Sequence, residues 1–169
     1  MKTFEMITKM LQDHRLEFTT VHHEVTLTSE ASAKARGEDI AIGAKAIVMK
    51  IDSEFKLFVL SAALRIDSRK IKEHFKAKSI RFATADELLQ QTGLVPGSIP
   101  PFGAPVLNLD LYVDTSVLVN ERVAFNAGSL TDSIIMRSKD YADISHGVIF
   151  DFSREQNTAE RDKDTSGGR

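Results

Sequence analysis

The chain has 169 residues, of which 42% are hydrophobic and 27% are charged, and its formal net charge is −2. These values indicate one soluble domain with a sizeable core, and the slightly negative charge excludes an overall basic field that would attract nucleic acid. The chain has no cysteine, which excludes disulfides, thiolate metal sites and a cysteine nucleophile.

The N-terminal segment carries Glu5 and Lys9 and lacks the apolar core of a signal peptide. The apolar runs elsewhere are too short to span a bilayer. We therefore expect a cytoplasmic protein without a membrane partner.

Apolar periodicity and capping residues predict the elements of the first half of the chain. Thr28 or Ser29 can cap a helix that ends at Gly37, and Thr84 with Glu87 forms a capping box. In chain order we expect a helix at 3–13, a strand at 18–25, a helix at 30–36, paired strands at 44–52 and 55–61, a helix at 68–75 capped by Asp67, a strand at 79–83 and a helix at 85–91 ending at Gly93.

The segment "TGLVPGSIPPFGAP", residues 92–105, holds all four prolines and three of the nine glycines. Proline fixes φ and donates no N–H, whereas glycine lets other groups approach the backbone. The pattern predicts a stiff, sharply turned loop, which is either a plain connector or a backbone surface held ready for a ligand.

Strand-like patterns dominate the chain after this loop. We expect strands at 105–114, 122–128, 133–138 and 147–152, and a short helix at 138–144 capped by Ser138. Residues 153–169 have balanced charge and no apolar periodicity, which predicts a disordered tail after a domain spanning 1–152. Because several strands follow one another directly, the fold class is α+β with a mixed sheet.

Common catalytic motifs are absent from the sequence. It contains no P-loop, no dinucleotide fingerprint and no serine in a nucleophile-elbow context. Histidines at metal-ligand spacing are also missing, so we expect no metal. His14 and His74 should lie on the surface, and at most one of the adjacent His22 and His23 could enter a pocket.

Two further features are ambiguous when each is considered alone. Lys45 opens a strongly apolar strand, where its ammonium could either serve a site or simply reach water. The segment "FNAGS", residues 125–129, is either a hairpin turn or a small-residue wall that lets a ligand approach the backbone.

Together these segments resemble the YbaK/ProX family of aminoacyl-tRNA deacylases, which is related to the editing domain of bacterial prolyl-tRNA synthetases. The resemblance spans about residues 18 to 150. The segments that carry it are, in chain order, "TSEASAKARG", "GAKAIVMK", "GLVPGSIPPFG" and "VAFNAGSLTDSIIM". It implies a compact, barrel-like mixed sheet with flanking helices, and hydrolysis of the ester that joins a wrong amino acid to the 3′ end of a tRNA.

The resemblance also implies the site residues. Lys45 corresponds to the pocket lysine, and "GSIPP", from Gly97 to Pro101, corresponds to the family's G-x-x-x-P loop. The implied catalytic residues are Lys45 and Gly97, and the implied substrate-binding residues are Thr28, Pro101, Asn126, Ala127, Gly128 and Ser129. Gly103 lies outside the G-x-x-x-P unit, so we expect it to tolerate a side chain better than Gly97.

An aminoacyl ester is already reactive, so its hydrolysis needs a positioned water and a stabilised oxyanion but no cofactor. The expected partner is the 3′ end of an aminoacyl-tRNA, with a synthetase in trans as a further possibility. Ala46 follows Lys45 where alanine-clearing relatives have asparagine, so the edited amino acid stays open, as does the oligomeric state. Two alternatives remain: a non-catalytic module that senses an aminoacyl or nucleotide ligand, and a general hydrolase of small esters.

Overall fold

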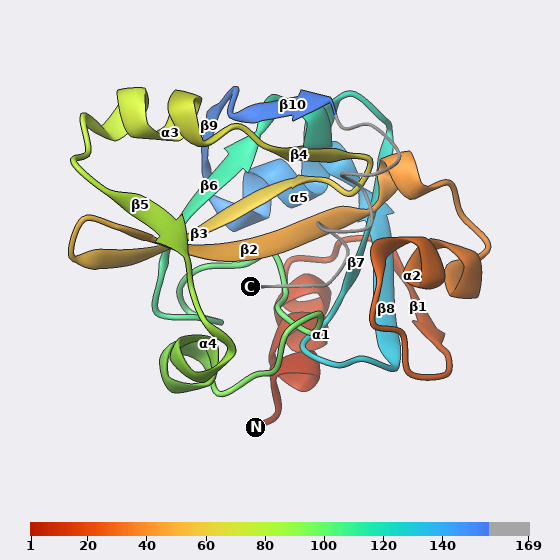
Figure 1. Ribbon diagram of the computed structural model, residues 1–169. Coiled ribbons are helices and arrows are strands. Elements are labelled where there is room, and N and C mark those ends of the chain that lie inside the picture. The colour runs from red at the N-terminus through yellow and green to blue at the C-terminus, as the bar shows by residue number, and fades with distance from the viewer. Residues whose placement is uncertain (156–169) are drawn as a thin grey trace.

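The computed structural model describes residues 1–155, in which helices are interspersed with runs of consecutive strands (Figure 1). The α-helices are α1 (Thr3–Asp13), α2 (Ser29–Arg36), α3 (Ser68–Phe75), α4 (Ala85–Thr92) and α5 (Ser138–Ser145). The strands are β1 (Phe18–His22), β2 (Ala44–Ile51), β3 (Glu54–Ser61), β4 (Leu64–Ile66), β5 (Ile80–Phe82), β6 (Asp110–Asp114), β7 (Arg122–Asn126), β8 (Asp132–Arg137), β9 (Val148–Phe150) and β10 (Ser153–Glu155). Short 3₁₀ helices lie at Ile40–Ile42 and Thr115–Leu118.

The strands form three hydrogen-bonded sheets. A five-stranded mixed sheet has the order β5-β2-β3-β6-β9, in which β6 is parallel to both β3 and β9. A three-stranded antiparallel sheet has the order β1-β8-β7, and β4 pairs with β10. One parallel bridge between Gly43 and Ala124 joins the start of β2 to β7.

The five-stranded sheet is buried on both faces because apolar residues of β2 and β3 point alternately to two core clusters. Val48 and Leu57 pack with α1, α4, α5 and the three-stranded sheet. Met49 and Phe58 point to the other side, where they pack beneath α3 with β4 and Phe152. The sheet is therefore a central layer with packed side chains on both faces, and the Gly43 bridge joins the start of β2, ahead of the part that pairs with β5, to the second sheet.

The predicted helix caps of the first half are confirmed. The Thr28 side chain accepts a hydrogen bond from the Ala31 N–H, and α2 ends at Gly37 with φ +73°. Thr84 and Glu87 form the complete capping box of α4. The caps fix where each helix begins and ends, so they also set the direction of the loops that surround the site.

Two local predictions after the proline-rich loop are wrong. The strand expected at 105–114 begins only at Asp110, because Leu107 and Leu109 lie buried in a turn whose backbone bonds are made locally. Ser138 is the first residue of α5 and not its cap, because its hydroxyl donates to the Asn120 carbonyl instead.

The expected mixed α+β fold is confirmed, but the sheet is not a closed barrel. Apart from the Gly43–Ala124 bridge, the three sheets within residues 1–155 are separate, and the end strands β5 and β9 of the largest one do not pair. The described structure also continues past the expected boundary at 152, because residues 153–155 form β10 and pair with β4. The rest of the expected tail lies outside the described residues. No helix within residues 1–155 is long and apolar enough to cross a membrane.

Candidate active site

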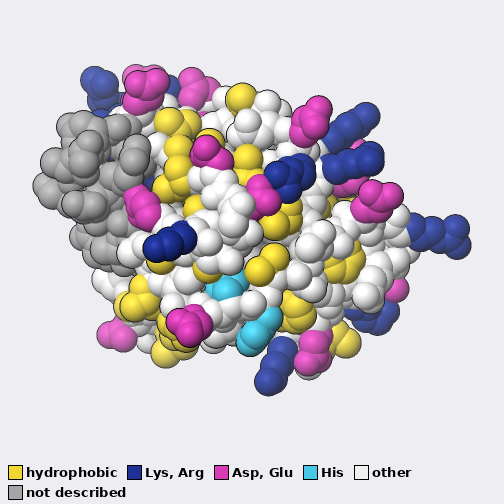
Figure 2. All heavy atoms as spheres, turned by 90° about the vertical axis from the view of Figure 1, so that its right-hand side faces the viewer, with side chains coloured by type: hydrophobic (Ala, Val, Ile, Leu, Met, Phe, Trp, Pro, Cys, Tyr) yellow, Lys and Arg dark blue, Asp and Glu magenta, His cyan; other side chains and the backbone are white. Residues whose placement is uncertain are grey.

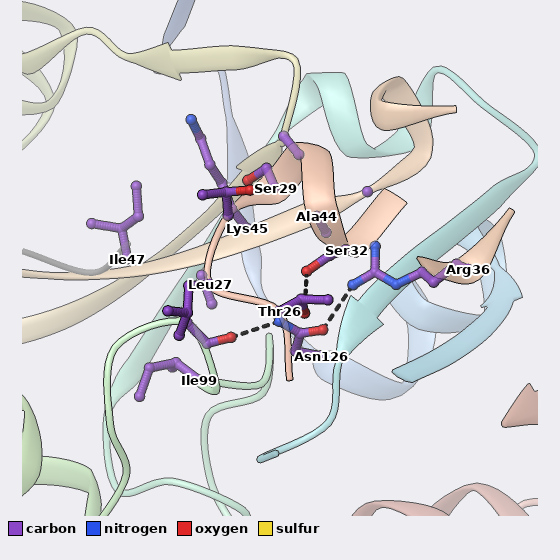
Figure 3. A pocket seen from close by; sticks show the side chains of 15 residues that line it. Thr26, Leu27, Ser29, Ser32, Arg36, Ala44, Lys45, Ile47, Ile99 and Asn126 are labelled. Atoms are coloured by element: carbon purple, nitrogen blue, oxygen red, sulfur yellow. Dashed lines mark hydrogen bonds between the residues drawn. The ribbon is translucent and has the colours of Figure 1, made fainter. Parts of the chain in front are cut away.

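A small cavity lies where β2, α2, the end of β7 and the proline-rich loop meet (Figure 3). Its volume is about 70 Å³, well below the roughly 300–1,000 Å³ of pockets that enclose drug-sized ligands. A space of this size suits a small side chain and leaves a nucleotide outside. The walls come from the segment before α2, from α2 itself, from β2 and from the loop at Gly97.

Hydroxyl groups line one wall of the cavity and apolar side chains another. Thr26 and Ser32 are buried, and their hydroxyl oxygens lie 2.8 Å apart in a hydrogen bond. The apolar part comes from Leu27, Ile47 and Ile99, of which Leu27 is 63% exposed at the rim. The cavity therefore offers both hydrogen-bonding groups and an apolar surface to a small ligand.

Lys45 is one of the residues that line this cavity. It is the second residue of β2 and pairs with Leu60 of β3, so its backbone is held by the central sheet. Its side chain is half-buried, and in Figure 3 the ammonium points away from Asn126. This places the cation at the mouth of the cavity and not at its polar inner end.

Asn126 connects the proline-rich loop to the three-stranded sheet. Its Nδ2 donates to the Gly97 carbonyl at 2.6 Å, and its Oδ1 accepts from Arg36 Nη2 at 3.0 Å (Figure 3). Oδ1 also accepts from Ser133 Oγ at 3.2 Å. Ser133 also accepts from Arg36 Nε at 2.9 Å, and His23 Nε2 lies 2.8 Å from its hydroxyl. The side-chain amide is therefore committed to holding protein groups together.

The remaining predicted residues lie outside the cavity. Pro101 is buried, and its carbonyl accepts a 2.7 Å hydrogen bond from Tyr141, a phenol whose pKa burial raises. Ala127 is fully buried in the core. Gly128 packs against Thr3 of α1 and, with Ser129, borders a different cavity at the start of that helix.

The structure thus brings together four of the predicted residues: Thr28, Lys45, Gly97 and Asn126. Thr28 lines the cavity while its hydroxyl oxygen caps α2. Three further residues that the sequence did not predict also line the cavity: Arg36, Thr26 and Ser32. Arg36 lies directly before the Gly37 that ends its helix, where a basic residue normally faces water, so no local pattern could indicate its role.

Arg36 is half-buried, and desolvation lowers its pKa to about 10. The guanidinium therefore still carries its charge at neutral pH.

Within residues 1–155 no cluster of three or more histidine, aspartate or glutamate side chains could hold a metal ion. On the side of the molecule that bears α2 and β1, acidic and basic side chains are interspersed (Figure 2).

Comparison with known proteins identifies the family to which the chain is related. A family model described as "Aminoacyl-tRNA editing domain" matches residues 23–144, which include all the cavity residues named above. The multifunctional Ser/Thr-tRNA deacylase ProXp-y of Escherichia coli K12 is 30% identical over 157 residues, covering 90% of this chain and 93% of that protein. The proline–tRNA ligase of Shouchella clausii is 32% identical over 100 residues, which cover 59% of this chain and 17% of the ligase.

Solved structures show the same fold. The crystal structure of a proposed trans-editing enzyme for prolyl tRNA synthetase superposes with a TM-score of 0.75 at 21% identity, covering 92% of this chain and 98% of that one. The hypothetical protein APE2540 gives a TM-score of 0.78 at 20% identity and covers 88% of this chain. The chain belongs to the aminoacyl-tRNA editing domain family, whose reaction is hydrolysis of the ester between a mischarged amino acid and its tRNA.

Proposed function

We propose that this aminoacyl-tRNA deacylase removes serine or threonine from mischarged tRNA and acts in trans to a synthetase. The observation that carries the proposal is the cavity of about 70 Å³ in which Lys45 and Gly97 lie beside the Thr26–Ser32 hydroxyl pair. A serine or threonine side chain is small and carries one hydroxyl, so it can fill this space and exchange hydrogen bonds with its wall. The relative from Escherichia coli is named for the same two amino acids.

In the proposed reaction, water attacks the ester carbonyl carbon, the bond to the ribose oxygen breaks, and that oxygen leaves with a proton. The products are the free amino acid and a tRNA with a free 3′ end. The Gly97 backbone orients the water and the terminal ribose, while Lys45 at the mouth neutralises phosphate or holds the terminal adenosine. Because the substrate is charged tRNA used in translation, we propose that the protein acts in the cytoplasm.

Editing of this kind has a clear physical purpose. A synthetase site discriminates against a smaller or isosteric amino acid by only about 1–3 kcal/mol, so a second hydrolytic site must clear the errors. The interspersed charges around α2 (Figure 2) suggest that contact with the tRNA body is local and sensitive to salt.

The direct test measures deacylation of tRNAs charged with serine, threonine, alanine, cysteine and proline by the purified protein. We expect turnover to be fastest for the serine and threonine esters. Lys45→Ala should slow this turnover about ten- to a thousand-fold, the range for loss of one charged group in a site. Lys50→Ala, near the far end of β2, is the matched control and should retain the parental rate.

Three results would contradict the proposal in different ways. Tight binding without turnover would favour the sensing module. Equal activity on small aminoacyl esters that lack the tRNA body would favour a general hydrolase. Preference for alanine, cysteine or proline would leave the reaction class intact and overturn the proposed amino acids.

A further inference from the structure

Arg36 makes a two-pronged contact across the wall of the active-site cavity. It is the last residue of α2, and its guanidinium reaches β7 and β8 (Figure 3). Nε donates to Ser133 at 2.9 Å, and Nη2 donates to Asn126 at 3.0 Å. A planar guanidinium held through two different nitrogens has one orientation, which a lysine ammonium cannot reproduce.

The surroundings of Arg36 are unusual for an arginine at the end of a helix. None of the ion pairs found within residues 1–155 includes it, and its two hydrogen-bond partners are neutral. Taking a guanidinium partly out of water without a carboxylate partner costs free energy. The hydrogen bonds of Arg36 therefore contribute little to the stability of the fold. We look for their function in the groups that they hold in place.

Those contacts lead to the proline-rich loop. Oδ1 of Asn126 receives hydrogen bonds from both Arg36 and Ser133, which orients the side-chain amide so that Nδ2 faces the Gly97 carbonyl at 2.6 Å. Without the donor from Arg36, the amide loses one of the two bonds that fix its orientation. Gly97 has φ +87°, a left-handed backbone conformation that favours glycine, so the group that Asn126 holds is the carbonyl of a glycine with no side chain of its own to pack.

We propose that Arg36 is a positioning residue for deacylation: it fixes Asn126 and, through it, the Gly97 carbonyl and the backbone that faces the ester. The effect on catalysis rests on the proposed function of Gly97, whereas the effect on the loop does not. Asn126 accordingly acts by holding the loop. The competing interpretation is that Arg36 itself binds a phosphate of the tRNA.

The test compares Arg36→Met, which keeps much of the apolar stem, with Arg122→Met. Arg122 is a suitable control because it also joins the region after α2 to β7, through a 2.6 Å contact with Glu38. It is exposed and lies outside the active-site cavity. Two readouts are needed: steady-state deacylation of the serine and threonine esters, and amide hydrogen exchange of the segment containing Gly97.

For Arg36→Met we expect kcat to fall about 10- to 100-fold, as for a small displacement of a reacting group. KM should change by less than about threefold, because ground-state binding of tRNA is untouched. Amide exchange around Gly97 should become faster, whereas Arg122→Met should change neither readout. Asn126→Ala should produce the same loop signature, and adding Arg36→Met to it should have little further effect.

A rise in KM with kcat and loop exchange unchanged would overturn the proposal in favour of direct phosphate binding. Unaltered kinetics and exchange in Arg36→Met would overturn it as well. If Arg36→Met does not fold, Arg36→Lys replaces it, because lysine keeps the charge but lacks the planar guanidinium. Amide exchange around Gly97 at the parental rate in Arg36→Lys would refute the positioning role. If the parent protein fails to deacylate either ester, the proposed function falls, while the exchange measurement still decides whether Arg36 restrains Gly97.

Discussion

Glycine at position 97 combines two properties that a side chain would disturb. Its φ of +87° lies in the left-handed region, and an added Cβ would lie 3.3 Å from Leu130 Cδ2. Its carbonyl is also held by Asn126. A side chain at position 97 would therefore both strain the backbone and disturb the hydrogen bond that fixes the loop at the cavity.

Gly97→Ala should therefore fold with a loss of about 1–2 kcal/mol in stability, the cost of a left-handed residue with a Cβ. Deacylation should slow about 10- to 100-fold, because the backbone that orients the reacting groups moves. Single-turnover rates and urea unfolding measure the two effects separately.

Gly93→Ala is the matched control for backbone strain. Gly93 ends α4 with φ +74°, and an added Cβ there would meet no atom within 4 Å. It should show a similar stability cost and a parental rate. Equal rates for the two variants would mean that the segment is only a connector.

Gly103 cannot serve as the milder comparison that the sequence suggested. An added Cβ there would lie 2.6 Å from the Leu109 carbonyl oxygen, a backbone atom in the buried turn before β6. The expectation failed because it considered only distance from the G-x-x-x-P unit. Close packing against a backbone segment has no signature in the neighbouring residues.

At the scale of elements, capping residues and apolar period located every α-helix to within a residue or two, because those signals are local. The exception in detail is α5, where Ser138 bonds the distant Asn120 carbonyl instead of its own helix. β4 and β10, each three residues long, were missed. Such short strands are stabilised by their partner and not by their own pattern.

The start of α4 provides a prediction about pH. Glu87 accepts hydrogen bonds from Arg81 at 2.7 and 2.9 Å and from the Thr84 N–H at 2.9 Å. The bonds from Arg81, followed by that from Thr84, lower the pKa of Glu87 from 4.5 to about 2. Because the folded pKa is lowered, the ionised form contributes stability above pH 4.5, and this contribution is lost as the pH falls towards 2.

Glu87→Gln should therefore unfold at lower urea concentration than the parent at pH 7, and the difference should shrink steadily below pH 4.5. Urea titrations at pH 7, 4 and 3 measure this trend. Glu73→Gln, an exposed position on α3, controls for the loss of one negative charge. A difference between Glu87→Gln and the parent that stays constant down to pH 3 would refute the assignment.

At the scale of the whole molecule, the sequence predicted the class of fold but not how the strands are shared among sheets. The parallel pairing of β3 with β6 joins residues about fifty positions apart, and no local pattern specifies it. The same limit applies to the site. Lys45 and Gly97 were predicted through the family resemblance, whereas the proposed role of Arg36 depends on the contact between α2 and Ser133 on the distant β8.

The C-terminal strand offers a test of how far the domain extends. β10 pairs with β4 in register, with Ser153 opposite Ile66 and Glu155 opposite Leu64. Lys70 of α3 also donates to the Ser153 carbonyl at 2.8 Å. These contacts cover the side of the sheet on which Phe152 is fully buried.

A chain ending at residue 152 should therefore be less stable than one ending at 155 by about 1–3 kcal/mol, the value of a few lost hydrogen bonds. Both chains lack 156–169, so the comparison isolates the three residues of β10. Urea unfolding of the two chains measures the difference, and substitution of Lys70→Met in the longer chain should reproduce only part of it. Identical midpoints for the two chains would return the domain boundary to residue 152 and make β10 a dispensable extension.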